Sequence, residues 1–144
     1  MPDSEVDWKF TKSGSRYYSG LWTPTLLGSD GALLSFSDTP YGTYMRMERA
    51  ITVWYKFNVG SGNSGASAVM RLGGLPFTHA ETSGIRSTGP QPHGLTFACT
   101  TYIQDGENFI RFRDQTMTSA KQISNFASEG VVRGNITYWI TQDA

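Results

Sequence analysis

The sequence predicts an all-β fold, an antiparallel β-sandwich with a jelly-roll-like arrangement of roughly eight strands, and three observations support this prediction. Sixteen glycines and six prolines, with many Ser and Thr residues, indicate frequent turns. Residues 50–59 alternate strictly between apolar and polar side chains, as a strand with one face in a core does. No long segment carries the apolar period of an amphipathic helix. The length of 144 residues is typical of a single domain.

The first part of the chain is expected to lead into the sandwich. We assign residues 1–19 to this N-terminal segment and residues 20–144 to the sandwich domain. Apolar and polar side chains alternate over residues 6–10, which predicts a short strand. The Ser-Gly-Ser sequence at 13–15 is expected to end it.

Two short strands are predicted next, over residues 20–26 and 32–36. Pro24 has no N–H to donate and holds the residue before it in an extended conformation. The first of these strands is therefore expected at a sheet edge or at a strand start. A glycine-containing turn at 28–31 separates the two, and a loop at 37–42 follows the second.

The clearest prediction is a pair of strands over residues 43–47 and 50–59, joined by a turn at 48–49. In the second strand the odd-numbered side chains are apolar, and they are expected in the core. The even-numbered side chains are then expected on the outer face. Trp54 belongs to this outer set, although its neighbours there are mostly polar.

A glycine-rich hairpin loop at 60–65 and a strand at 66–73 are predicted next. The strand is expected to end at Gly73-Gly74-Leu75-Pro76-Phe77-Thr78, since Pro76 cannot continue a β-ladder. Leu75 and Phe77 flank this proline, and we expect them to cover one end of the core.

Residues 78–93 contain both histidines and are predicted to form a long irregular segment. Strands are predicted at 95–103 and 109–113, with a hairpin turn at 105–108 between them. Residues 115–128 are expected to form a turn of helix or a weak strand.

The last predicted strand, residues 131–141, directs Ile136, Tyr138 and Ile140 inward and therefore Trp139 outward. A large aromatic on an outer face indicates a subunit interface, a platform for stacking on sugar rings, or cover by a neighbouring loop. We take Trp54 and Trp139 as candidate binding residues on this basis.

Phe109, Arg111 and Arg113 share the outward side of their strand. Such a stripe suits another subunit, an acidic glycan, or simply solvent. We include Arg111 and Arg113 among the candidate ligand-binding residues, together with Tyr102 and His93.

Charge and cysteine content exclude several classes of protein. Twelve Lys and Arg balance twelve Asp and Glu, which argues against a nucleic-acid binder or a polybasic membrane anchor. No apolar run approaches the roughly 20 residues of a membrane-spanning helix, and residues 1–7 are too acidic for a signal peptide. The single cysteine, Cys99, excludes an intrachain disulfide and is expected to be a buried hydrophobic residue. These features are typical of a protein that folds in a reducing cytoplasm.

Catalytic and metal-binding patterns are weak, so we expect a protein without enzymatic activity, metal or cofactor. His79, Glu81 and His93 match no compact ligand spacing, and we interpret both histidines as exposed loop residues. The acidic residues lie mostly in turns or termini, away from any paired arrangement for cleaving a glycosidic bond. Gly60-x-Gly62-x-x-Gly65 resembles a dinucleotide fingerprint only in its letters, because no helix is predicted after it.

Four short motifs occur in a recognisable order. They are Gly20-x-Trp22-Thr23-Pro24, Gly42-x-Tyr44-x-Arg46, Ile51-Thr52-Val53-Trp54 and Gly74-Leu75-Pro76-Phe77-Thr78. With the closing Asn135-Ile136-Thr137-Tyr138-Trp139, this set resembles the C-terminal β-sandwich domains of tailed-bacteriophage tail fibres and related receptor-binding proteins. The resemblance covers roughly residues 20–141. It departs from the family at Met47-Glu48-Arg49, where a glycine-containing turn is usual, and at Asn135, where a small residue is common.

The resemblance implies a homotrimeric jelly-roll tip on a virion appendage, in contact with other tail proteins and folded in the host cytoplasm before assembly. It also implies adhesion to a bacterial surface saccharide, and residues 1–19 would then link to a fibre shaft. The leading expectation is thus a receptor-binding domain without catalysis. The alternatives are a structural trimerisation or virion decoration module, and a small polysaccharide depolymerase.

Overall fold

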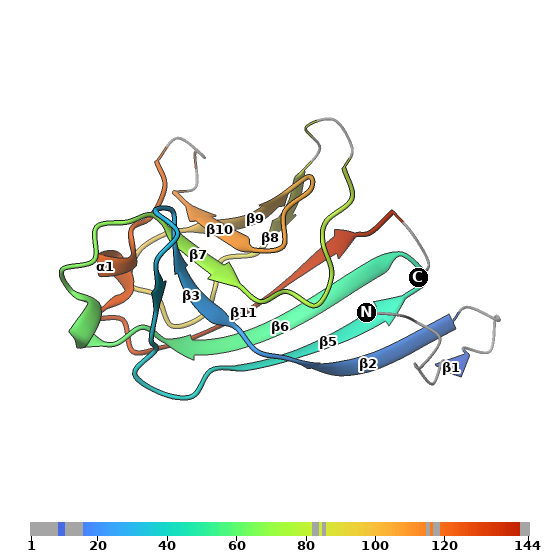
Figure 1. Cartoon of the computed structure of the whole chain (residues 1–144), viewed down its shortest axis with the longest axis horizontal. Coiled ribbons are helices and arrows are strands. Elements are labelled where there is room, and N and C mark those ends of the chain that lie inside the picture. The colour runs from blue at the N-terminus through green and yellow to red at the C-terminus, as the bar shows by residue number, and fades with distance from the viewer. Residues whose placement is uncertain are drawn as a thin grey trace.

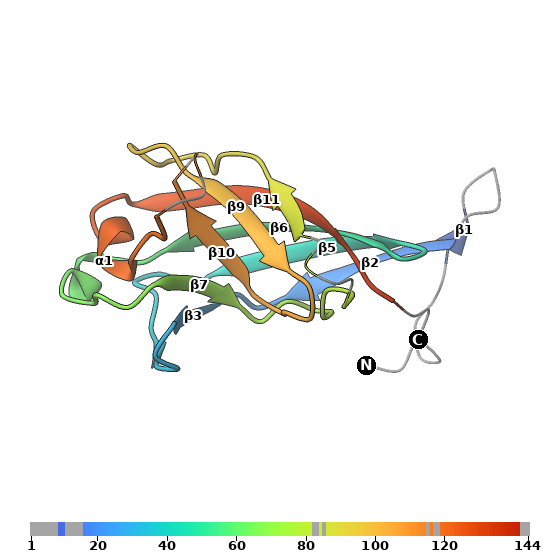
Figure 2. The same ribbon diagram turned by 90° about the horizontal axis from the view of Figure 1, so that it is seen from above.

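The structure is a computed structural model of the chain that describes residues 9–10, 16–81, 84, 86–114, 116 and 119–141. Two antiparallel sheets lie face to face and form a β-sandwich, as Figure 1 shows. Figure 2 shows, from above, that the strands of one sheet extend beyond the end of the other. The all-β sandwich predicted from the sequence is confirmed.

The sheet with the longer strands, called sheet A here, has the strand order β1-β2-β5-β6-β11. Its strands are β1 (Lys9–Phe10), β2 (Arg16–Trp22), β5 (Tyr41–Met47), β6 (Ala50–Asn58) and β11 (Val131–Trp139). The facing sheet B has the order β4-β3-β7-β10-β9-β8. Its strands are β4 (Leu33–Leu34), β3 (Thr25–Gly28), β7 (Met70–Gly73), β10 (Ile110–Arg113), β9 (Thr100–Gln104) and β8 (Arg86–Gly89).

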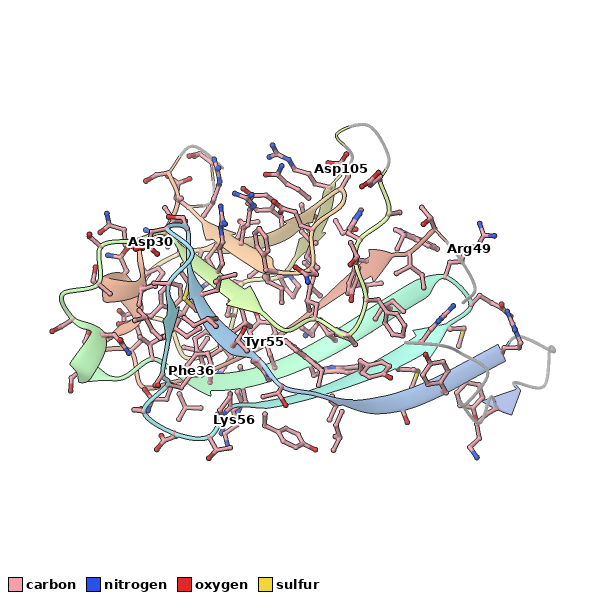
Figure 3. The ribbon with its side chains drawn as sticks, in the orientation of Figure 1. Asp30, Phe36, Arg49, Tyr55, Lys56 and Asp105 are labelled. Carbon is pink, nitrogen blue, oxygen red and sulfur yellow. The ribbon has the colours of Figure 1, made fainter. Side chains whose placement is uncertain are left out.

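Side-chain alternation on β6 follows the prediction from residues 50–59. Ile51 and Val53 have no exposed surface, and Tyr55 and Phe57 are almost fully buried. Figure 3 shows Tyr55 pointing into the space between the sheets and Lys56 pointing to the opposite side. Burial of such apolar side chains contributes about 25 cal/mol for each Å² removed from water, so β6 is a central source of stability.

Aromatic rings fill the core at the end closed by the short helix α1 (Ile123–Phe126). The Phe126 ring lies 5.2 Å from that of Phe112 and 6.2 Å from that of Phe57, centroid to centroid. These distances are typical of edge-on and tilted aromatic pairs. The predicted turn of helix within residues 115–128 is therefore present, and its apolar face completes the core.

Two of the sequence motifs interlock across β2 and β5. In the antiparallel register Gly20 lies opposite Tyr44, and Trp22 lies opposite Gly42. A Cβ atom at Gly20 would come within 2.8 Å of the Tyr44 ring, and one at Gly42 within 2.6 Å of the Trp22 indole. Each glycine therefore leaves the space that the opposite aromatic occupies. This reciprocal packing gives a physical reason for the spacing of both motifs.

The Gly74-Leu75-Pro76-Phe77 turn covers the inner face of sheet A where sheet B ends. Gly74 has φ +85°, and a Cβ there would lie 2.2 Å from the carbonyl oxygen of Thr23. The Phe77 ring packs edge-on against Tyr44 at 5.7 Å, and the Tyr138 hydroxyl donates a hydrogen bond to the Phe77 carbonyl (2.9 Å). The prediction that Leu75 and Phe77 cover one end of the core is confirmed.

A buried arginine lies under this cover. Arg46 has no exposed surface, and its guanidinium carbon lies 5.1 Å from the Phe77 ring centroid. Its Nε donates a hydrogen bond to the Glu48 carbonyl (2.9 Å), in the turn where Glu48 adopts φ 53°. Glycine is the residue that favours such a backbone conformation. The turn at 47–49 thus keeps the shape of a glycine turn without containing glycine.

Several boundaries differ from the predictions. The loop at 60–65 is not a hairpin loop, because β6 lies in sheet A and β7 in sheet B. It contains a single 3₁₀ turn, Ser61–Asn63. The strand predicted at 66–73 is reduced to Met70–Gly73 for the same reason, since residues before it cross between the sheets.

Other strands are also shorter or differently placed than predicted. The irregular segment at 78–93 contains strand β8, which pairs with β9. The strand predicted at 95–103 begins only at Thr100. The sandwich includes β2 from Arg16 onward, although residues 16–19 were assigned to the N-terminal segment. The short strand predicted at 6–10 is described only for Lys9–Phe10, and the break at 13–15 lies outside the described residues.

Two further features concern Cys99 and the helices. Cys99 is buried, as predicted, and burial raises the pKa of its thiol from 9.0 to about 12. None of the helices within the described residues is long and apolar enough to cross a membrane.

Candidate functional site

The predicted site residues lie on two opposite surfaces of the sandwich. Trp54 and Trp139 project from the outer face of sheet A, and His93 lies beside β11 at the edge of that face. Tyr102, Arg111 and Arg113 belong to the outer side of sheet B. The six residues therefore do not form one site, and the two surfaces are described separately.

The outer face of sheet A is built from rows of cross-strand neighbours. One row is Leu21, Thr43, Trp54 and Asn135, and the next along the strands is Ser19, Met45, Thr52 and Thr137. Directly opposed side chains on one face of a sheet lie close enough to interact. The side chains in these rows point away from sheet B, so large apolar side chains on this face do not pack in the core. Those that are exposed are Leu21, Tyr41, Met45, Met47, Trp54 and Trp139.

A hollow of about 410 Å³ lies on this face around Trp54. Its volume is within the range of small-molecule sites, about 300–1,000 Å³. Trp54 is 43% exposed, and its backbone carbonyl accepts a hydrogen bond from the buried Trp22 indole (3.2 Å). A side chain in the core therefore fixes the backbone of the strand that carries this exposed ring. The residues that line the hollow are Tyr41, Thr43, Trp54, Tyr55, Lys56, His93, Arg133, Gly134 and Asn135.

His93 forms one wall of the hollow through backbone pairing. Its N–H donates to the Arg133 carbonyl (2.7 Å), and the Arg133 N–H donates back to the His93 carbonyl (3.0 Å). The next residue, Gly94, has φ +96°, and a Cβ there would lie 2.3 Å from the Val131 carbonyl oxygen. Only glycine allows this close approach, so the sequence at 93–94 fixes the position of the wall.

The lining groups have a definite chemical character. Trp54 and Tyr41 offer aromatic surface, while Thr43, Asn135 and His93 offer hydrogen-bonding groups. Lys56 and Arg133 are neighbours in register and add two positive charges. Among the described residues that line the hollow there is no carboxylate. The hollow therefore suits a neutral or acidic ligand that combines hydroxyl groups with a flat apolar surface.

Trp139 lies apart from the hollow. It pairs with Ala50 at the far end of β6, four positions along β11 from Asn135. Strand geometry places such positions about 13 Å apart. The Thr52 and Thr137 hydroxyl groups, 2.8 Å apart, lie between the two tryptophans. Trp139 lies in one cross-strand row with Ala50 and Met47, and Met45 lies in the next row. We call Met45, Met47 and Trp139 the apolar half of the face.

The outer side of sheet B carries alternating arginine and aromatic side chains. The Arg71 and Arg111 guanidinium carbons lie 4.6 and 5.1 Å from the Phe109 ring centroid. The stripe predicted at 109–113 is thus extended by Arg71 of the neighbouring strand β7. Glu107 binds Arg111 through both carboxylate oxygens, and this hydrogen bonding is the main cause that raises the pKa of Arg111.

Tyr102 was predicted as a ligand-binding residue and is fully buried on this side. The Arg86 and Arg113 guanidinium carbons lie 5.1 and 5.6 Å from its ring centroid. Its ring is therefore occupied by cation–π contacts within the protein and is not open for stacking on a ligand.

The two histidines lie in different places and do not share a site. His79 is buried, so the interpretation of both histidines as exposed holds only for His93. The His79 Nδ1 donates to the Ala80 carbonyl (2.7 Å), and its Nε2 bonds with the Ser87 hydroxyl (2.9 Å). The described residues contain no group of three or more His, Cys, Asp and Glu able to hold a metal ion.

Some lining residues were absent from the sequence-based candidates. Tyr41, Lys56 and Arg133 line the hollow, and Arg71 and Arg86 belong to the sheet B surface. Side-chain alternation identifies Lys56 with Trp54 and Arg133 with Trp139 as outward residues. It does not identify which strands are neighbours, and that information determines the hollow.

Comparison with known protein families, curated proteins and solved structures gives no match to this chain.

Proposed function

We propose that this protein is a non-catalytic receptor-binding domain of the tail-fibre type, which binds a bacterial surface saccharide in the hollow around Trp54. One observation carries the proposal. An exposed indole lies in a hollow of about 410 Å³ that is also lined by tyrosine rings and by hydroxyl, amide, imidazole and cationic groups. This is the combination that recognises a sugar ring, which has an apolar face and a polar rim.

The binding mode follows from the positions of the lining groups. The Trp54 ring stacks on the C–H face of a sugar, and Tyr41 extends the aromatic surface beside it. Asn135 and Thr43 lie in the same cross-strand row as Trp54 and bond to ring hydroxyls. Lys56 and Arg133 favour a saccharide that carries a carboxylate or a phosphate.

The motif resemblance supports the same proposal from a different direction. Three motifs that resemble tail-fibre domains meet at one place, where Tyr44 packs on Phe77 and the Gly20 and Gly42 strands pair. A set of motifs that pack on one another specifies a scaffold, and the hollow lies on the outer side of that scaffold. We expect this scaffold on a virion appendage, together with other tail proteins.

Self-association through the apolar half of sheet A completes the proposal. Met45, Met47 and Trp139 are between 40% and 58% exposed and lie in two adjacent cross-strand rows. Large apolar side chains exposed together on one face are typical of protein–protein interfaces. A homotrimer that buries this half would leave the hollow at the boundary between subunits, open to a long saccharide.

Binding of bacterial surface oligosaccharides to variants of the chain tests the function. Trp54→Ala is expected to weaken binding by about tenfold or more, since it removes the stacking surface. Trp139→Ala removes the same type of residue from the same face outside the hollow, and is expected to retain binding per subunit. Isothermal titration calorimetry with oligosaccharides from bacterial capsules and lipopolysaccharides measures both.

Equal affinity of Trp54→Ala and the unaltered protein for a bound oligosaccharide would reject the hollow as the site. Shortening of the oligosaccharides during the titration would instead favour the depolymerase alternative.

A structural trimerisation or decoration module is the second candidate, and the apolar half of sheet A is the observation that favours it. This candidate predicts a tight assembly that binds none of the saccharides tested. The calorimetric panel therefore separates it from the receptor-binding proposal.

A further inference from the structure

The outer side of sheet B is a strongly basic surface in a chain with no net charge. Four arginines, Arg71, Arg86, Arg111 and Arg113, surround the Tyr102 and Phe109 rings. Glu107 is the carboxylate that pairs with one of them, Arg111. Like charges gathered around the same rings repel one another, and an anion among them relieves this repulsion. The structure therefore concentrates positive charge on this surface.

A pocket of about 100 Å³ opens among these side chains. A water molecule needs about 10–15 Å³ by this kind of measure, so the pocket has room for a group of a few non-hydrogen atoms. Its volume is about a quarter of that of the hollow on sheet A. The residues that line it are Ser29, Val69, Arg71, Tyr102, Arg111, Phe112, Arg113 and Ala120.

Two buried polar atoms of the pocket residues have no hydrogen-bond partner. They are the Tyr102 hydroxyl, on a side chain with 0% exposure, and the Arg71 Nε. A buried polar group without a partner is costly, and native proteins rarely leave one without a reason. The Tyr102 hydroxyl lies close to Arg111, whose guanidinium can only donate, so the hydroxyl proton finds no acceptor there.

The missing partner must be an acceptor. Arginine nitrogens only donate hydrogen bonds, so the guanidinium groups around Tyr102 offer no acceptor for its proton. The Arg71 Nε–H likewise needs an acceptor. An oxyanion supplies several acceptor oxygens and compensates the clustered positive charge at once.

We propose that this pocket binds a small oxyanion, a sulfate, phosphate or carboxylate group, through the Arg71 Nε–H, the Tyr102 hydroxyl and the guanidinium groups of Arg111 and Arg113. Ser29 adds a hydroxyl at the rim, held in place by a hydrogen bond from the Val69 N–H (3.1 Å). Glu107 orients Arg111 through hydrogen bonds to both of its carboxylate oxygens. The pocket lies on the opposite sheet from the hollow and does not depend on saccharide binding there.

Nuclear magnetic resonance of the intact chain tests this site. Sodium sulfate, sodium phosphate and sodium galacturonate are added in turn, with sodium chloride at matched ionic strength as the reference. The Arg71 Nε–H signal is expected to move saturably with at least one of the three, and the melting temperature to rise in parallel. The separate additions show whether an inorganic oxyanion or a sugar carboxylate is preferred.

Two variants and one control localise the effect. Arg71→Gln and Tyr102→Phe are each expected to weaken oxyanion binding by about tenfold, because each removes one donor. Tyr102→Phe keeps the ring that Arg86 and Arg113 cover, so it preserves the packing if Arg71→Gln does not fold. Arg49→Gln removes an exposed arginine at the opposite end of the molecule (Figure 3) and is expected to bind as the unaltered chain does.

Absence of any saturable shift with all three anions would overturn the proposal, as would equal loss of binding in Arg49→Gln. In the first case water fills the pocket, and in the second the anions act only through the general charge of the surface.

Discussion

At the scale of single residues, burial determines the pKa values of several ionisable side chains. Cys99 and Tyr55 are ionisable groups inside an apolar core, and burial raises the pKa of both. The pKa of Tyr138 is also raised, and burial is again the main cause. A group that cannot ionise in the folded protein favours unfolding once the solution pH exceeds its pKa in the unfolded chain. These residues therefore predict how stability depends on alkaline pH.

Cys99→Ala is expected to flatten the loss of stability at high pH. The folded pKa of Cys99 is raised from 9.0 to about 12, so its contribution is fully present below pH 9 and declines between pH 9 and pH 12. Each pH unit in that window lowers the free energy of unfolding by about 1.4 kcal/mol. Urea unfolding at pH 8.0 and pH 10.5 should show that the unaltered chain loses about 2 kcal/mol more than Cys99→Ala. Both proteins contain Tyr55 and Tyr138, so the contributions of these tyrosines to the loss of stability cancel in this comparison. Equal losses in the two proteins would contradict the burial of the thiol.

Outward and inward residues could be predicted where the signal is local. The burial of Ile51, Val53 and Phe57 follows from alternation within one strand, and the structure confirms it. The burial of Tyr102 could not be predicted, because it depends on Arg86 and Arg113 from two other strands. His79 is a similar case, since Ser87 of β8 satisfies its ring only after the strands pair.

At the scale of elements, reciprocal packing of glycine and aromatic residues sets the pairing of β2 with β5. Gly42→Ala is expected to destabilise the fold by about 1–3 kcal/mol, because the added methyl group overlaps a buried ring. That ring belongs to Trp22, whose indole nitrogen is held by the Thr43 and Trp54 carbonyls and cannot move without losing those bonds.

Gly62→Ala is the matched control for this change. A Cβ at Gly62 meets no atom within 4 Å, and its backbone needs no positive φ. The expected change is within about 0.5 kcal/mol. Urea unfolding of both variants measures the difference. Equal stability of Gly42→Ala and Gly62→Ala would show that the register of β2 and β5 does not rest on this contact.

Element boundaries were predicted well where apolar alternation was strong and poorly elsewhere. Strand β8 was missed because Arg86-Ser87-Thr88-Gly89 has no apolar residue and pairs on one side only. The apolar residues before Thr100 suggested a longer strand, but Phe97 packs on Phe126 of α1 at 5.4 Å instead of entering a ladder. A local turn signal at 60–65 likewise could not indicate which sheet the next strand joins.

At the scale of the whole molecule, the two outer faces of the sandwich have different characters. Sheet A presents aromatic and apolar side chains with two cations at one end, and sheet B presents arginines over aromatic rings. The sequence predicted outward Trp54, Trp139, Arg111 and Arg113, but not their division between opposite faces. That division is a property of topology, because β10 and β11 follow one another in the chain and lie in different sheets.

We expect the outer face of sheet A to contact other subunits, and not to remain exposed to solvent. Sedimentation velocity of the unaltered chain and of Met47→Glu tests this, since a charge placed in the cross-strand row of Trp139 opposes burial of the apolar half. We expect the unaltered protein to sediment as a species of close to three times the 15.9 kDa chain mass, and Met47→Glu to sediment as a folded monomer. A monomer in both cases would contradict the proposed trimeric tail-fibre assembly and would favour an independent saccharide-binding module.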